Sequence, residues 1–214
     1  MRIGILGSGA VGQTLGSKMV QLGHEVLMGS REPANPTAIT WAKKEGPRAS
    51  FGTFADAAAF GEILFNCTLG SASLEALRQA GAQNLNGKIL VDTANPLDYS
   101  EDYWTLTVCN TDSLGEQIQR AFPGLRVVKT LNTINSNVMV EPGKLPERTD
   151  VFVSGNDNEA KAVVISILRD WFGWKSIIEL GDISTSRAVE MYVILWRNLR
   201  LRISSHRFNI RVVA

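Results

Sequence analysis

The chain has 214 residues, of which 44% are hydrophobic and 20% charged, and its formal net charge is +1. This length suits one sizeable domain, and the balanced charge gives no electrostatic footprint for nucleic acid. Two cysteines without a CxxC spacing indicate neither a disulfide framework nor a metal cluster. With no signal peptide before the first apolar run and no stretch of about 18 apolar residues, we expect a cytoplasmic protein without a membrane partner.

The clearest chemical signal is a glycine-rich turn between a predicted strand, residues 2–6, and a predicted helix, residues 11–22. The six residues of this G-x-G-x-x-G turn are Gly7, Ser8, Gly9, Ala10, Val11 and Gly12. In a strand–turn–helix unit, the first glycine permits a tight turn, the second admits a pyrophosphate and the third lets the helix pack closely on the strand. Free N–H groups at the start of the helix would bind the phosphates. Glycine also marks ordinary turns, but this context favours a dinucleotide.

The second strand, residues 24–28, indicates which dinucleotide is bound. Proteins that bind NAD usually place an acid at the end of this strand, where it holds the ribose hydroxyls. Here the strand leads instead into Ser30 and Arg31. Arg31 can neutralise a 2′-phosphate with its planar fork, and Ser30 can donate a further hydrogen bond. A plain surface arginine is the alternative, and the acidic Glu32 alongside weakens the signal, but the pattern favours NADP.

The remaining chain alternates predicted strands and helices, which indicates an α/β fold with a doubly wound, mostly parallel Rossmann sheet. Further strands are expected at residues 48–51, 62–68, 88–92, 126–128, 149–154 and 176–180, and helices at 37–45, 53–60, 71–80, 113–122, 158–172 and 184–203. Residues 135–148 are predicted to be a long connection. We expect residues 1–182 to form the NADP-binding domain, with residues 183–214 a helix and tail rather than a separate substrate domain.

Ligands in such sheets bind beyond the carboxyl ends of the strands. Three later strand ends carry small polar groups that do not ionise, and these include Thr68, Asn95 and Asn132. Asn and Thr could hydrogen-bond a nicotinamide carboxamide, although the same residues also favour ordinary turns. Their recurrence at three strand ends favours a ligand crevice. An irregular insertion at residues 98–112 could cover this crevice or serve as a surface loop.

The chain offers little for acid–base catalysis. Of its two histidines, His24 precedes the second strand, on the expected adenosine side, and His206 lies in the tail. No Ser–His–Asp arrangement or metal-spaced cluster is present, so we expect no catalytic acid or base. Direct hydride transfer between two cofactor-like rings needs mainly positioning and exclusion of water.

The last predicted helix combines apolar residues, among them Met191 and Leu195, with several arginines. Core packing is the simpler interpretation of the apolar residues, although they also allow a homodimer through this helix. The arginines could meet an anionic substrate or form a solvated face.

Together these motifs resemble the F420-dependent NADP oxidoreductase family. The matching segments are residues 1–9, 29–31, 95–97, 129–133, 155–157, 181–183 and 187–190, which extend over most of the chain. Glu32 and Pro33 depart from the further basic residues that family members often carry there. The resemblance implies hydride transfer between NADP(H) and the deazaflavin coenzyme F420, a small-molecule electron carrier. It also implies that Ser30 and Arg31 hold the 2′-phosphate and that the rings are surrounded by Thr68, Leu69, Asn95, Pro96 and Asn132.

Two further hypotheses concern the acceptor. The chain could be an NADPH-dependent reductase of a flavin or a small carbonyl compound. It could instead be a non-catalytic NADP(H) sensor, which would bind the dinucleotide tightly and turn over no acceptor.

Overall fold

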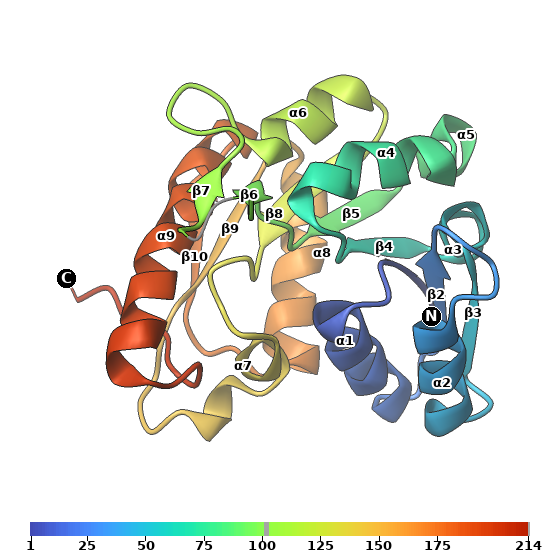
Figure 1. Cartoon of the computed structure of the whole chain (residues 1–214), viewed down its shortest axis with the longest axis horizontal. Coiled ribbons are helices and arrows are strands. Elements are labelled where there is room, and N and C mark those ends of the chain that lie inside the picture. Colours follow the sequence, from blue (N-terminus) through green and yellow to red (C-terminus); the bar gives the residue numbers. More distant parts are fainter. Residues whose placement is uncertain (101–102, 214) are drawn as a thin grey trace.

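The computed structural model of the chain describes residues 1–100 and 103–213. Figure 1 shows a large twisted sheet with helices on both faces. Its strands, in chain order, are β1 (Arg2–Leu6), β2 (Glu25–Ser30), β3 (Ala49–Thr53), β4 (Ile63–Asn66), β5 (Ile89–Asp92), β8 (Arg126–Thr130), β9 (Val151–Gly155) and β10 (Ile177–Gly181). A separate antiparallel pair consists of β6 (Leu97–Asp98) and β7 (Thr105–Leu106).

The helices are α1 (Ala10–Gln21), α2 (Pro36–Glu45), α3 (Phe54–Phe60), α4 (Gly70–Ala80), α5 (Ala82–Leu85), α6 (Leu114–Ala121), α7 (Ser136–Val140), α8 (Asn158–Ser166) and α9 (Ser186–Ile203). Short turns of 3-10 helix are η1 (Pro142–Lys144) and η3 (Ile183–Thr185), and η2 (Ile167–Trp171) is a π-helical turn. Local capping sets several of these starts. Thr53 and Asp56, for example, form a reciprocal capping box at the start of α3.

The strand order is β10-β9-β8-β5-β4-β1-β2-β3, and every neighbouring pair is parallel except β8 with β9. The predicted doubly wound, mostly parallel sheet is therefore confirmed. After β3 the chain crosses to β4 on the other side of β1, which makes the β1–β4 boundary a topological switch point. Connections diverge there, so a crevice opens beyond the carboxyl ends of these strands.

Two apolar cores lie on opposite faces of the sheet because strand side chains alternate with period two. On β4 and β5, Phe65 and Val91 join the core beneath α1, α2, α7 and α8. Leu64 and Leu90, the preceding residues, join the core beneath α3, α4, α5 and α6. Each strand thus contributes to both layers, which fixes the orientation of its carboxyl end.

Besides the short α5, where no helix was predicted, the structure differs from the predicted elements mainly in three places. The connection at residues 135–148 contains α7, whose Asn135 cap accepts a hydrogen bond from the N–H of Asn137 at 3.1 Å and whose Val138, Met139 and Val140 are buried. A helix this short depends on tertiary packing rather than on a periodic signal. The helix at 158–172 ends in the π-helical η2, and the insertion at 98–112 contains β6 and β7, with residues 101–102 of that prediction outside the described residues.

The last helix, α9, places Val189 and Val193 in the interior and leaves Met191 and Leu195 36% and 52% exposed. A homodimer through this helix, and the division of the chain at residue 182, stay predictions. Within the described ranges, no helix has the combined length and apolar character that crossing a membrane requires.

Candidate functional site

The glycine turn lies at the switch point, and its three glycines have different physical roles. Gly7 has a φ of 117°, which favours glycine, and a Cβ there would lie 2.6 Å from the carbonyl oxygen of Cys67. A Cβ on Gly12 would lie 2.1 Å from the carbonyl oxygen of Gly7. Gly9, in contrast, has an ordinary φ of −73° and open space around its missing side chain. Folding therefore needs Gly7 and Gly12, whereas the absence of a side chain at Gly9 leaves room for a ligand.

A cavity of about 500 Å³ opens in front of this turn. It is lined by the turn, the end of β2 and the loop after it, the segment after β4, and the starts of α3 and α4. The lining residues are Gly7, Ser8, Gly9, Ala10, Val11, Ser30, Arg31, Glu32, Asn35, Phe54, Cys67, Thr68, Leu69 and Ala72. Gly9 is the N-cap of α1 and provides no side-chain cap, so the first N–H groups of the helix are available to an anion. The predicted phosphate-binding residues, apart from Gly12, thus line one cavity, while Gly12 packs behind the turn.

One end of the cavity is formed by the loop after β2. Arg31 is exposed, and within the described residues no hydrogen bond or ion pair engages its guanidinium. Ser30 is buried, and its hydroxyl donates to the carbonyl oxygen of Glu32 at 2.6 Å. The expectation that this hydroxyl donates to a 2′-phosphate stays a prediction, and Ser30 lines the cavity. Ser30 also shapes the loop that presents Arg31.

Sequence reasoning missed Asn35, which orders the loop at this end. Its side chain accepts from the N–H of Ala38 at 3.1 Å as the N-cap of α2, and from the hydroxyl of Ser8 at 3.3 Å. It thereby ties the glycine turn to the loop that carries Arg31. An Asn followed by Pro36 at the first helical position is the local signal that could have identified this cap.

A smaller cavity of about 140 Å³ continues from the first beyond the ends of β4 and β5. The two share Val11, Cys67, Thr68 and Leu69, and the smaller one is also lined by Gly70, Thr93, Ala94, Asn95, Leu97 and Tyr99. Burial raises the pKa of the Cys67 thiol to about 12, so this cysteine is a neutral thiol at physiological pH. The walls of this cavity are therefore uncharged near neutral pH.

Asn95 and Asn132 form a reciprocal clasp between the segments that follow β5 and β8. The Asn95 side-chain amide donates to the carbonyl oxygen of Asn132 at 2.8 Å, and the Asn132 amide donates to Oδ1 of Asn95 at 2.8 Å. The Asn132 amide also donates to the carbonyl oxygen of Val189 in α9 at 3.0 Å. Asn95 lines the smaller cavity whereas Asn132 lies behind it and is 6% exposed. Asn132 can therefore act on a ligand through Asn95.

The predicted Thr68, Leu69 and Pro96 take different positions around the smaller cavity. The Thr68 hydroxyl lies 2.7 Å from Oδ1 of Asn66 and 2.8 Å from the hydroxyl of Ser73, which fixes its orientation at the cavity wall. Leu69 lines both cavities and is 62% exposed. Pro96 is buried, and its carbonyl oxygen accepts the N–H of Thr107 at 2.8 Å.

Behind this wall lies a buried charged cluster that sequence reasoning did not assign. The ammonium of Lys129, in β8, lies 2.6 Å from Asp92 and 2.7 Å from Glu190 of α9, and all three side chains are at most 2% exposed. Burial lowers the pKa of Lys129, but the two carboxylates outweigh it, so its pKa is raised above the usual value. Glu190 also accepts the N–H groups of Leu114 and Gly115 at 2.8 and 3.0 Å. The cluster thus joins the sheet, α6 and α9.

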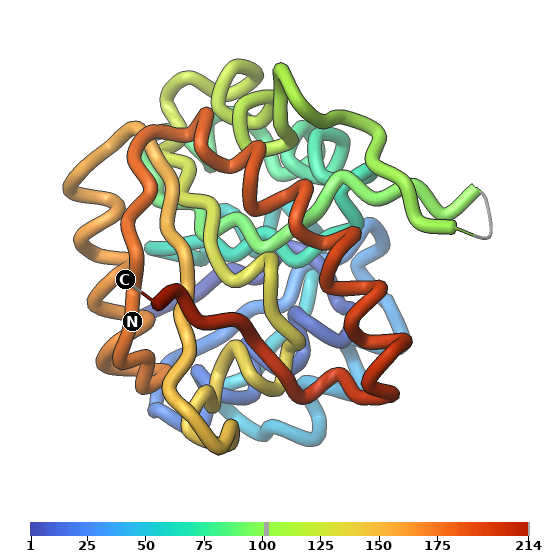
Figure 2. The backbone as a smooth tube through the Cα atoms, turned by 90° about the vertical axis from the view of Figure 1, so that its left-hand side faces the viewer, coloured from blue at the N-terminus to red at the C-terminus, as the bar shows by residue number. Residues whose placement is uncertain are grey.

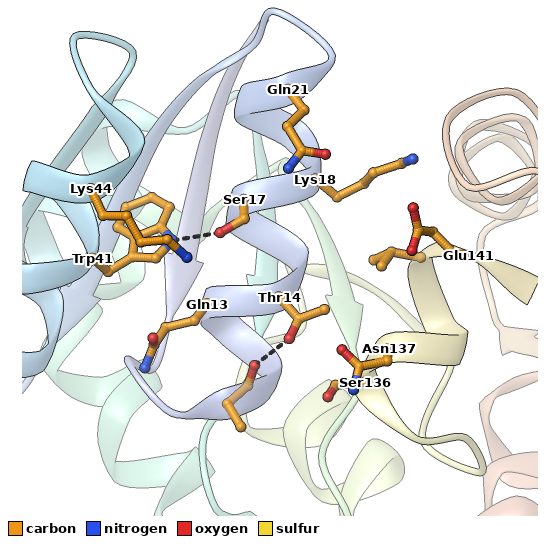
Figure 3. A pocket seen from close by; sticks show the side chains of 12 residues that line it. Gln13, Thr14, Ser17, Lys18, Gln21, Trp41, Lys44, Ser136, Asn137 and Glu141 are labelled. Atoms are coloured by element: carbon orange, nitrogen blue, oxygen red, sulfur yellow. Dashed lines mark hydrogen bonds between the residues drawn. The ribbon is translucent and has the colours of Figure 1, made fainter. Parts of the chain in front are cut away.

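A second hollow of about 550 Å³ lies on the outer side of α1, between α2 and α7 (Figure 3). Its labelled side chains include Lys18 and Gln21 of α1, Lys44 of α2 and Glu141, which follows α7. Ala10 is the one residue that it shares with the cavity at the glycine turn. Ligands of doubly wound sheets bind beyond the carboxyl ends of the strands, and no strand end lines this hollow. We therefore do not assign the functional site to it, although its volume is similar to that of the cavity at the glycine turn.

The prediction that His24 lies on the adenosine side is wrong. His24 precedes β2 at its amino end, and its ring packs on Trp171 of η2 with the ring centroids 4.3 Å apart. Ligands of parallel sheets bind at the opposite end of the strands, beyond their carboxyl ends. Among residues 1–100 and 103–213, no group of three His, Cys, Asp or Glu side chains is placed to hold a metal ion.

The switch-point cavity, the open glycine turn and the doubly wound sheet define a Rossmann-fold, NADP-dependent oxidoreductase. The family model described as NADP oxidoreductase, coenzyme F420-dependent, matches residues 2–96. A crystal structure of a candidate F420-dependent NADP reductase from Arthrobacter sp. FB24 is 45% identical, with a TM-score of 0.94 over 99% of both chains. The chain belongs to the F420-dependent NADP oxidoreductase family.

Two curated relatives differ in how much of their length this chain spans. The F420-dependent NADP reductase of Methanocaldococcus jannaschii is 28% identical over 222 residues, which cover 99% of this chain and 98% of the relative. Metalloreductase STEAP3 of Rattus norvegicus is 29% identical over 192 residues, which cover 88% of this chain and 36% of the relative. The chain therefore spans about the whole of one relative and little more than a third of the other.

Proposed function

We propose that this protein passes a hydride between NADP(H) and a deazaflavin coenzyme of the F420 type. The observation that carries the proposal is the pair of joined cavities. The larger one offers the glycine turn and Arg31 to a dinucleotide, and the smaller one offers uncharged walls beyond β4 and β5. Family membership and the methanogen reductase, which matches over its whole length, support the same acceptor.

The dinucleotide would lie across the switch point. Its pyrophosphate would sit on the N–H groups at the start of α1, beside Gly9 and Ala10, and its 2′-phosphate would meet Arg31. The nicotinamide would then enter the smaller cavity between Thr68 and Asn95. Leu69, exposed at the junction of both cavities, would cover the ring and exclude water from it.

The chemistry that the residues must provide is positioning. The smaller cavity contains two titratable side chains among its lining residues, Cys67 and Tyr99, and burial raises the pKa of each above its usual value. Neither is suited to exchange a proton near pH 7. Hydride transfer between two carbon atoms needs no protein base, and the proton that completes acceptor reduction would come from water. Asn132 would hold Asn95, and through it the ring, in position.

The test uses NADPH deuterated at the transferred position together with oxidised deazaflavin. We expect deuterium on the deazaflavin carbon, without loss to solvent, because the transfer is direct. Label released to water would contradict direct transfer. Reduction of a flavin or a small carbonyl compound, with no reduction of the deazaflavin, would favour those acceptors instead. Tight NADPH binding without turnover of any acceptor would identify a sensor.

A matched pair of variants tests how the rings are held. Asn132→Ala removes the clasp on Asn95 and should lower kcat more than it weakens NADPH binding. Asn137→Ala, in α7 beside the outer hollow, is the control and should leave both quantities unchanged. Equal weakening of NADPH binding and turnover by Asn132→Ala would indicate general loss of structure rather than ring positioning.

A further inference from the structure

An aromatic arm stands beside the smaller cavity. We use this name for Tyr99, Tyr103 and Trp104, which lie in the β6–β7 hairpin between Leu97 and Leu106. Figure 2 shows this hairpin, in green, extending outward from the body of the molecule near α9, in red. Tyr99 and Tyr103 are 52% and 47% exposed. Exposed aromatic rings grouped on one hairpin are a feature that folding alone does not require.

Contacts with α9 and within the arm fix the positions of these rings. The guanidinium of Arg197 lies 4.5 Å from the ring centre of Tyr103 and 5.6 Å from that of Trp104. Asn198 donates a hydrogen bond of 2.9 Å to the Tyr103 hydroxyl. Trp104 in turn meets Tyr99 edge to face, with ring centroids 5.5 Å apart. Cation–π and edge-to-face contacts of this kind hold Tyr99 in place before any ligand arrives.

Tyr99 connects the arm to the site. It lines the smaller cavity together with Thr68, Asn95 and Leu97. This cavity, at about 140 Å³, is well below the size of about 300–1,000 Å³ that usually encloses a small-molecule ligand. A ring that meets the nicotinamide there must therefore extend past the rim, and Tyr99 is the aromatic surface at that rim. A small carbonyl compound would need no such surface.

We propose that Tyr99, supported by Trp104 and Arg197, is the surface on which the flat, three-ring hydride acceptor stacks, and that it sets the affinity for this acceptor. The inference deepens the proposed function and rests on it for the position of the nicotinamide in the smaller cavity. Deazaflavins and flavins share this ring system, so Tyr99 could stack on either of them. The experiment therefore measures both acceptors. We expect the arm to add little to NADP(H) affinity, because Tyr99 does not line the larger cavity, where the pyrophosphate and the 2′-phosphate would bind.

The experiment compares Tyr99→Leu, which keeps apolar bulk but removes the ring, with Tyr99→Phe, which keeps the ring. Initial rates are measured with NADPH and either deazaflavin or FMN, and the Kd of NADPH is measured separately. We expect Tyr99→Leu to raise the acceptor KM about ten-fold, equivalent to about 1.4 kcal/mol, as for loss of one stacked ring. The kcat, the NADPH Kd and all values for Tyr99→Phe should stay close to wild type.

Phe51→Leu on β3 is the matched control, since Phe51 is also a partly exposed aromatic residue, 40% exposed, but lies outside both cavities. If wild type reduces the deazaflavin and Tyr99→Leu leaves its KM unchanged, the arm proposal fails and the proposed function stands. If wild type reduces FMN alone, the deazaflavin assignment fails, and the same KM comparison with FMN decides the arm. If wild type reduces neither flat acceptor, both proposals are overturned.

Discussion

Replacing Lys129 with methionine tests whether the buried charged cluster holds the fold together. The substitution keeps an unbranched side chain of similar volume but leaves the carboxylates of Asp92 and Glu190 buried, at 0% and 2% exposure, without their shared cation. Removing one partner of a buried ion pair typically costs about 3–5 kcal/mol. In a domain of this size, each kcal/mol lowers Tm by about 2–4 °C, so we expect Tm to fall by about 6–20 °C.

The measurement is urea unfolding, supported by calorimetric Tm, at neutral pH. Lys161→Met is the matched control, because the Lys161 side chain is also buried, at 5% exposure, but its partner Glu179 is 47% exposed and can be hydrated after the change. That control should lose about 1 kcal/mol or less from the ion pair. Adding Glu190→Gln to Lys129→Met should cost less than Glu190→Gln costs in wild type, since one unpaired charge is then removed. Equal losses in the two lysine variants would refute the reasoning.

Three further predictions follow from the site and from α6. Arg31→Ala should weaken NADPH binding by about 1.5–3 kcal/mol and leave NADH binding unchanged; equal losses for both dinucleotides would mean that Arg31 supports the loop only. Gly9→Val should abolish the rise in Tm that NADPH causes while leaving the Tm of the free protein near that of Gly143→Val, because both glycines face open space without a positive φ. Retained stabilisation by NADPH in Gly9→Val would show that the turn is structural. Arg187 beside Glu116 holds the pKa of that carboxyl below its usual value of 4.5, so its stabilising contribution is present above about pH 4.5 and is lost as pH falls below it. Unfolding free energies between pH 6 and pH 3 should therefore fall less steeply in Glu116→Gln than in wild type, and parallel curves would contradict the assignment.

The glycine turn could be predicted from the sequence because its physical requirements are local. A side chain on Gly12 would collide with the carbonyl oxygen of Gly7 in the same turn, and one on Gly7 would collide with that of Cys67, just after the neighbouring strand. The G-x-G-x-x-G spacing is therefore enough to predict that these positions need glycine. Arg31 was likewise identifiable, since it follows the second strand directly. That Arg31 binds the 2′-phosphate of NADP stays a prediction.

The buried cluster and the aromatic arm could not be predicted in the same way. Asp92, Lys129 and Glu190 come from three distant parts of the chain, and nothing in their local sequence distinguishes them from surface charges. The alternation of strands and helices predicts that Asp92 and Lys129 lie at strand ends. It does not predict that α9, which carries Glu190, packs against the sheet. The hydrogen bond from the Ser30 hydroxyl to the carbonyl oxygen of Glu32 is likewise not visible in the sequence pattern, although such contacts are common for serine in loops.

The position of Glu190 has a consequence for how this sequence can change over evolutionary time. One carboxylate serves the ammonium of Lys129 and two backbone N–H groups at the start of α6. Replacing Glu190 by an apolar residue would leave the two N–H groups without their acceptor in a site closed to water, and Lys129 would keep only Asp92 and the carbonyl oxygen of Ala94. We therefore expect position 190 to keep a side chain that can accept hydrogen bonds, since no change at position 129 could replace the acceptor of the two N–H groups.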